Sequence, residues 1–165
     1  MLGSNVTSSL RIVQPTPPGG SSSDDKDCIS VEDHKPLIPP GKYSARYTGH
    51  RTHIMFARAH KVILEFEVCE GPYARNRIPH YGRAKRVAQP TGSGGKFTLS
   101  AGGDLYRRVL RVLDRNKVRA DRISLAAFRS MLFTIHVRTV DKDSRGAPLP
   151  EAARYSVVDT FEDGR

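Results

Sequence analysis

The sequence predicts a mainly β domain, and two observations support that fold class. After residue 40 the chain alternates strand-like runs of apolar and polar residues with turns rich in Gly, Pro, Asn and Asp. One stretch with helical spacing follows the third run. We expect five strands, at residues 41–50, 60–68, 77–87, 131–140 and 153–161, and one helix at residues 104–118. That order fits a five-stranded Greek-key barrel of the OB type, with its α-helix between strands 3 and 4.

The 165-residue chain is expected to form one domain preceded by an arm. Residues 1–35 are rich in Ser, Pro, Gly and Asp. Such a composition buries too little apolar surface to offset the entropy of ordering. We therefore expect a disordered N-terminal arm over residues 1–35 and an OB-type domain over residues 36–165.

The first two strands are predicted from their alternation. In the first, Tyr43 and Tyr47 share a side with Ala45, so we expect both rings to pack in the core. The second has one continuous apolar side, made by Val62, Leu64, Phe66 and Val68. The segment between these strands is expected to be a mobile loop or an irregular extension.

The third strand contains Pro79, which has no N–H for a sheet ladder and so indicates an edge, a bulge or a break. The Gly-rich stretch after this strand predicts a flexible loop. In the helix that follows, Leu105, Val109 and Val112 recur at helical spacing. Arginines fill much of its other side, either as a solvated face or as a contact for nucleic acid.

The last two strands are again predicted from alternation. Phe133, Ile135 and Val137 form the side of the fourth strand that we expect to be buried. In the fifth strand, alternate residues point to opposite sides, one beginning with Tyr155 and the other with Ser156.

Charge is distributed unevenly along the chain. Residues 1–35 hold three Lys/Arg and five Asp/Glu, while the remaining 130 residues hold 24 and 12, a net charge of +12. A surplus of that size attracts polyanions, of which nucleic acid is the commonest. A generally soluble cationic surface is the alternative interpretation.

Several classes of protein are disfavoured. The two cysteines, Cys28 and Cys69, make no disulfide framework. No apolar run approaches the ~20 residues of a membrane helix, and the first residues do not resemble a secretory signal. A soluble, cytoplasmic protein without a membrane partner is therefore expected.

The search for catalytic and metal-binding motifs is negative. The segment GSGGKF resembles a phosphate-binding loop, but Pro90 replaces its first glycine and Phe97 replaces its Ser or Thr. There is no CxxC, no HExxH and no acidic calcium loop, and a cluster of His50, His53 and His60 is a weak metal site. We expect no catalytic residue, metal or cofactor, and no enzyme.

Aromatic residues interleaved with cations provide the positive signal. Basic grooves follow the phosphates of single strands, while aromatic rings stack on the bases. The candidate nucleic-acid-binding residues are Arg46, Arg51, His53, Phe56, Tyr73, Arg75, Arg77, Tyr81, Arg83, Lys85, Arg86, Lys96 and Arg138. For Tyr81, a structural ring that covers the barrel is the alternative role.

Three segments carry a resemblance to a known family. PPGKYSARYTGH, VILEFEVCEGPYARNRI and SMLFTIHVRTVDKDSRGAPLPEAARYSVVD together resemble a single-stranded-DNA-binding protein of a phage or mobile element. The similarity covers roughly residues 38–161. It implies an OB fold, coating of single-stranded DNA in replication or recombination, and no catalysis.

Other functions stay open. An OB-type module that docks on a protein is one alternative, because the fold does not determine the function. An RNA-binding protein is another. Exposed strand edges would allow copies of the chain to form a homo-oligomer, and replication or recombination proteins are further candidate partners.

Overall fold

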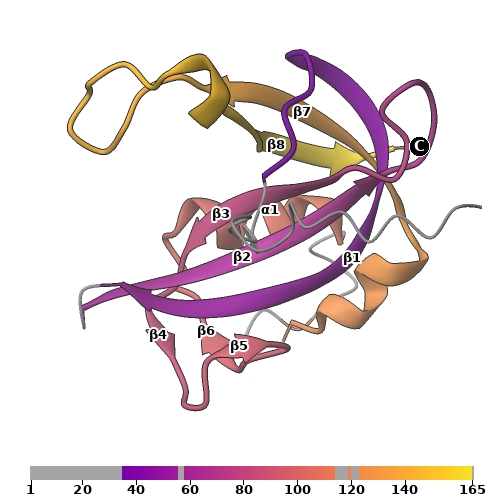
Figure 1. The fold of residues 1–165 in the computed structure, drawn as a ribbon. Coiled ribbons are helices and arrows are strands. Elements are labelled where there is room, and N and C mark those ends of the chain that lie inside the picture. Colours follow the sequence, from indigo (N-terminus) through magenta and orange to yellow (C-terminus); the bar gives the residue numbers. More distant parts are fainter. Residues whose placement is uncertain (1–34, 56–57, 114–118, 120–122, 165) are drawn as a thin grey trace, which may run out of the picture. The chain divides into compact units, whose positions relative to one another are not determined.

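The longest strand, β1 (Gly41–Met55), pairs with two other strands and so organises the sheet. The computed structural model describes residues 35–55, 58–113, 119 and 123–164. Within β1, Gly41 to Arg46 pair with β7 (Leu132–Val140), and Ala45 to Met55 pair with β2 (Ala59–Val68). A register shift between Tyr47 and Gly49 marks an irregularity of the bulge type, which bends and twists a strand. The sheet is therefore strongly curled (Figure 1).

The other strands extend this sheet on both sides. β3 (Arg77–Arg83) pairs with β2, and β8 (Tyr155–Asp163) pairs with β7, which gives the order β3-β2-β1-β7-β8. The short β5 (Gly92–Ser93) pairs with β1, while β4 (Arg86–Val87) and β6 (Phe97–Thr98) form a second sheet. Every pairing is antiparallel. The fold is thus mainly β, with a half-barrel sheet.

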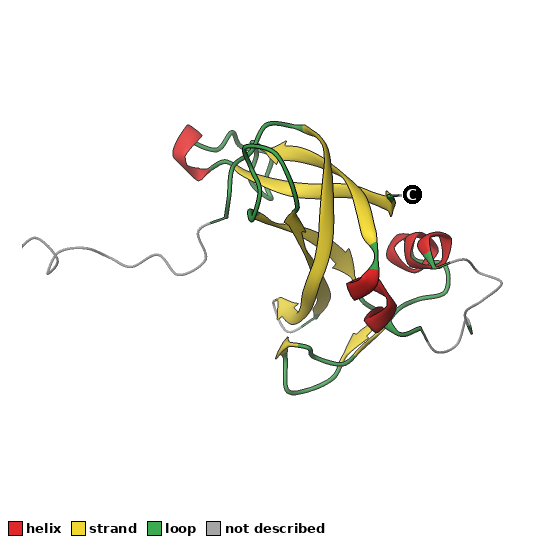
Figure 2. Cartoon of the chain, turned by 90° about the vertical axis from the view of Figure 1, so that its right-hand side faces the viewer, coloured by secondary structure: helices red, strands yellow, loops and turns green. Residues whose placement is uncertain are grey.

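In the described part of the chain, short helical segments accompany the sheet (Figure 2). They are α1 (Asp104–Val112) and the 3-10 helices η2 (Leu125–Ser130) and η3 (Glu151–Ala153). The apolar face of α1 is buried, as its spacing predicted, and Leu105 occupies the space that a side chain at Gly82 of β3 would need. In the part of the chain that is described, no helix combines the length and apolarity needed to cross a membrane.

The inward sides of the strands form an aromatic core. Four rings pack there with neighbouring centroids 5.0 to 6.1 Å apart: Phe66, Phe128, Phe133 and Phe161. The predicted burial of the apolar side of β2 is confirmed. Tyr47 is also buried, at 5% exposure, and Tyr43 packs against the core while half exposed. The expected role of both tyrosines in packing is therefore confirmed.

Strands are present at all five expected positions, but several boundaries differ; β8, for example, begins and ends two residues later than expected, at Tyr155 and Asp163. β1 continues to Met55, because residues up to there pair with β2. The third strand ends at Arg83, since the N–H of Lys85 turns to the carbonyl of Thr98 and begins the small second sheet. The Gly-rich segment expected to be a loop contains β5. The edge position indicated by Pro79 is confirmed, because β3 ends the strand order.

Two expectations fall partly outside the described residues. Of the expected arm, only Lys35 is described, and of the expected helix, residues 114–118 are not.

The two end strands of the sheet, β3 and β8, meet at a seam. The described residues show no backbone ladder between them. Instead, the buried side chain of His80 on β3 donates a hydrogen bond from Nδ1 to the carbonyl oxygen of Val158 on β8, at 2.8 Å. The same imidazole packs edge-to-face on Phe161, with ring centroids 5.2 Å apart. A side chain therefore provides a connection that the backbone does not.

The seam predicts a pH dependence of stability. Burial lowers the pKa of His80 below its ordinary value of 6.5, against the opposing effect of the hydrogen bond to Val158. Between the folded-state pKa and about 6.5, the unfolded chain binds a proton that the folded chain does not. The free energy of unfolding should therefore fall as the pH drops below about 7, and this contribution should level off below the folded-state pKa.

Denaturant titrations between pH 7.5 and 5 measure that dependence in the wild type and in His80→Asn. The amide can still donate to Val158 but cannot titrate, so this variant should lose part of the pH slope, whatever its stability at pH 7.5. Equal slopes for the two proteins would contradict the assignment.

Candidate nucleic-acid interface

A groove of about 970 Å³ opens on the seam. β3 and β8 supply two of its walls, and the first turn of α1 supplies a third. Arg58, which lies just before β2, and residues 142–144 of the β7–β8 loop lie at its margins. The groove thus combines two sheet edges with the segments that follow β1 and β7.

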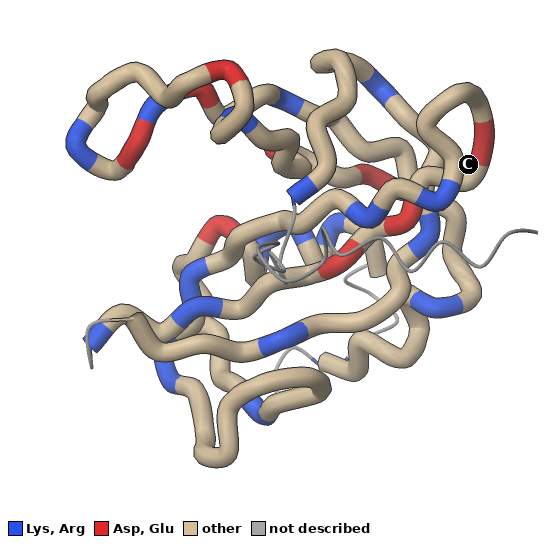
Figure 3. Tube along the Cα trace, in the orientation of Figure 1, with Lys and Arg blue, Asp and Glu red and all other residues tan. Residues whose placement is uncertain are grey.

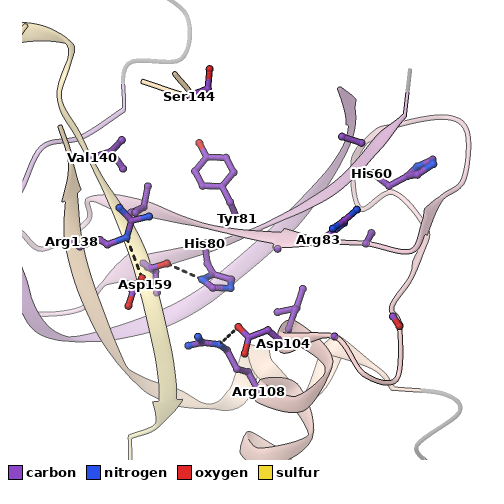
Figure 4. A pocket seen from close by; sticks show the side chains of 18 of the residues that line it. His60, His80, Tyr81, Arg83, Asp104, Arg108, Arg138, Val140, Ser144 and Asp159 are labelled. Atoms are coloured by element: carbon purple, nitrogen blue, oxygen red, sulfur yellow. Dashed lines mark hydrogen bonds and ion pairs between the residues drawn. The ribbon is translucent and has the colours of Figure 1, made fainter. Parts of the chain in front are cut away.

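Tyr81 stands in this groove, and 38% of the residue's surface is exposed (Figure 4). The reason is the alternation of β3, which turns His80 and Gly82 inward and Tyr81 outward. In Figure 4 its ring lies between Arg138 on one side and Arg83 with His60 on the other. An exposed ring in a groove with cations is the combination by which proteins bind single strands, because rings stack on bases and cations contact phosphates.

Positive charge exceeds negative charge along the groove. Its cationic side chains are Arg58, Arg83, Lys85, Arg108, Arg138 and Lys142, and its acidic side chains are Asp104, Asp143 and Asp159. Two of the cations are paired, Arg108 with Asp104 at 2.8 Å and Arg138 with Asp159 at 3.1 Å. The hydrogen bond from Arg108 lowers the pKa of Asp104.

The remaining charges leave the groove basic. Asp143 accepts hydrogen bonds from the backbone N–H groups of Arg145 and Ala147, at 2.8 and 2.9 Å, and so orders the loop. The four cations that form no ion pair with another described residue are Arg58, Arg83, Lys85 and Lys142. Such cations are free to neutralise phosphates.

The outer face of β1, β2 and β3 is more balanced. Arg51 on β1 lies 2.9 Å from Glu65, and Arg77 on β3 lies 3.1 Å from Glu67. Figure 3 shows acidic positions close to basic ones along the sheet. Both predicted arginines are therefore already neutralised within the sheet.

The groove brings together only four of the predicted residues: Tyr81, Arg83, Lys85 and Arg138. Arg46 and His53 are exposed on β1, outside the groove. Tyr73 packs edge-to-face on Tyr43, with centroids 6.1 Å apart, and Arg75 is exposed in the same turn. The other two that are described, Arg86 and Lys96, belong to β4 and to the segment between β5 and β6. Phe56 lies outside the described residues.

Sequence reasoning missed three groove residues, Arg58, Lys142 and Tyr155, together with Lys35, which lies over the groove tyrosines. The ammonium of Lys35 lies 4.1 Å from the ring centroid of Tyr155 and 5.7 Å from that of Tyr81. The expected barrel topology could have indicated Tyr155. A barrel that brings strands 3 and 5 together also brings Tyr155 close to Tyr81.

A second cavity, of about 590 Å³, lies between the β5–β6 segment, α1 and η2. Its lining is largely apolar and includes Phe97, Leu99 and Tyr106. His50 at its edge is held in place, with Nδ1 3.0 Å from the hydroxyl of Tyr47 and Nε2 3.1 Å from the carbonyl of Gly95. Burial raises the pKa of Tyr47 to about 12, so its hydroxyl keeps its proton.

His50, His53 and His60 were considered in the sequence as a weak metal site. Among the residues that the structure describes, no three His, Cys, Asp or Glu side chains are grouped so that they could hold a metal ion. The contacts of His50 are explained by packing alone.

Comparisons with protein-family models, with curated proteins and with solved structures found no match to this chain. Membership of the family that the sequence resembles therefore stays a prediction.

Ser156 on β8 holds the segment that carries Lys35. Its backbone N–H donates to the carbonyl of Pro36 at 2.9 Å. Its buried hydroxyl accepts from the N–H of Ile38 at 2.8 Å and donates to the carbonyl of the same residue at 2.9 Å. This hydroxyl fixes the chain next to the groove.

Ser156→Ala should therefore lower the free energy of unfolding by about 1–3 kcal/mol, because two buried backbone groups of Ile38 lose their partner. Urea titration measures the loss. Ser144→Ala, at an exposed loop position, is the matched control and should be close to neutral. Equal stability of the two variants would refute the role of Ser156.

Proposed function

We propose that this protein binds single-stranded nucleic acid, with DNA preferred over RNA, in the groove around Tyr81, and that it catalyses no reaction. One observation carries the proposal: an exposed aromatic ring stands in a groove among cations that have no acidic partner in the described part of the chain. Phosphates would be contacted by Arg58, Arg83, Lys85 and Lys142, and a base would stack on Tyr81.

The arrangement of the strands supports the proposal, which takes the fold to be an OB-type barrel. The five long strands follow the order β3-β2-β1-β7-β8, and α1 comes between the third and the fourth of them in the chain. OB folds bind oligonucleotides on strands 2 and 3 and with the loops after strands 1 and 4. The groove is lined by residues of β3, by Arg58 after β1, and by Lys142 and Ser144 after β7.

The resemblance to binding proteins of phages and mobile elements extends the proposal to a process. Coating of single-stranded DNA during replication or recombination needs an affinity that depends little on sequence. Phosphate contacts and ring stacking supply such an affinity, because every nucleotide has a phosphate and a flat base. Replication or recombination proteins would then be the partners.

The salt dependence of binding tests the proposed phosphate contacts. Fluorescence polarisation with labelled poly-dT, poly-rU and duplex DNA, at two salt concentrations, measures both affinity and salt dependence. The affinity for poly-dT should fall by about 0.7 log units per log unit of salt for each phosphate contact. Arg83→Ala should reduce that slope by about one contact, whereas Arg129→Ala, at an exposed position on η2, should not.

Each outcome of that titration separates the alternatives. Tighter binding of poly-rU than of poly-dT would indicate an RNA-binding protein. Salt-insensitive binding, or equal binding of duplex DNA, would contradict the proposal. No binding of any polynucleotide, with capture of a protein that survives nuclease treatment, would favour an interaction module.

Variants of Tyr81 test the proposed stacking of a base on its ring. Tyr81→Ala should cost about 1–3 kcal/mol of binding free energy, because it removes the ring on which a base stacks. Tyr81→Phe keeps the ring and should bind nearly as well as the wild type. The same titrations measure both, and equal affinity of Tyr81→Ala and the wild type would exclude stacking at this position.

A further inference from the structure

We propose that Tyr81 and Tyr155 form a two-ring slot for a single unpaired base, and that the ammonium of Lys35 occupies this slot until a base displaces it. The inference rests on the proposed function and adds to it a second stacking residue and a competitor supplied by the chain itself.

The contacts of Lys35 locate the slot. Its Nζ lies 4.1 Å from the ring centroid of Tyr155 and 5.7 Å from that of Tyr81, so one small charged group is within cation–π distance of both rings. Both tyrosines line the same groove. The two rings therefore border one small volume, and a flat aromatic ligand that enters it meets both.

The seam between the end strands keeps the two rings together. Tyr81 directly follows His80 on β3, and Tyr155 is the first residue of β8. The hydrogen bond from His80 to Val158, at 2.8 Å, joins these two strands. A buried hydrogen bond thus joins the two strands that carry the rings, while Tyr81 is exposed and Tyr155 is partly exposed.

Lys35 can leave the rings without disturbing the fold. The bonds that hold its segment to β8 are made by Pro36 and Ile38 with Ser156, beyond Lys35 in the chain. Lys35 itself is exposed, and an exposed ammonium over a ring is held more weakly than a base stacked on one. A base should therefore displace the ammonium, which then lies close to the phosphate of the same nucleotide.

Binding of a dT oligomer to variants tests the slot. Tyr155→Ala should weaken binding roughly 5- to 150-fold, whereas Tyr155→Phe should stay close to the wild type. Because both rings contact the same base, the losses of Tyr81→Ala and Tyr155→Ala should not multiply in the double variant. Thermal melts show that each variant is folded before its affinity is measured.

A second measurement follows Lys35 directly in the wild-type protein. Its ε-methylene group is bonded to Nζ, which lies over the Tyr155 ring, so the ε-protons should show an upfield ring-current shift in the NMR spectrum of the free protein. Addition of the oligomer should move these resonances to ordinary lysine positions. Resonances that keep their shift in the saturated complex would overturn the displacement.

The two proposals fail in different ways. If the wild type does not bind the oligomer with salt dependence, the proposed function fails. If the wild type binds and Tyr81→Ala weakens the complex, but Tyr155→Ala binds as tightly as the wild type, the slot fails and the proposed function stands.

Discussion

The shared pairing of β1 with two neighbours is the constraint on which the rest of the structure depends. Its first residues pair with β7 and its later residues with β2, and the pairing changes near the irregularity at Tyr47 and Gly49. One strand therefore belongs to both halves of the sheet. Because the strand bends, the far ends of the two halves, β3 and β8, come together, and the groove forms where they meet.

The inner side of this curled sheet packs the core, and its outer side carries the charged residues. Inside, packed aromatic rings and the aliphatic residues of β2 fix the curvature, and the buried imidazole of His80 joins the two edges. Outside, Glu65 and Glu67 neutralise the arginines beside them. The groove holds cations that form no ion pair with another residue of the described ranges. The position of a cation, more than the total charge, thus decides whether it can meet a phosphate.

Much of the fold could be predicted because alternation is a local property. The buried side of β2 and the outward side of Tyr81 follow from two-residue periodicity. Pro79 indicated an edge, a bulge or a break, and the strand order shows that β3 is an edge. The site was harder, because it depends on which strands become neighbours. Arg51 was predicted to contact phosphate, but in the folded sheet it lies beside Glu65. Tyr155 was recognised as a site residue only from the structure, in which β8 lies next to β3.

We propose that an unpaired polynucleotide lies in the groove at the seam. Mapping of backbone amide chemical-shift changes on addition of a dT oligomer tests this most directly. We expect the largest changes from Tyr81 on β3 to Lys85 just after it, at the start of β8 and in the loop around Lys142. Changes confined to the second cavity around Phe97 and Tyr106, or spread evenly over the basic surface, would contradict it.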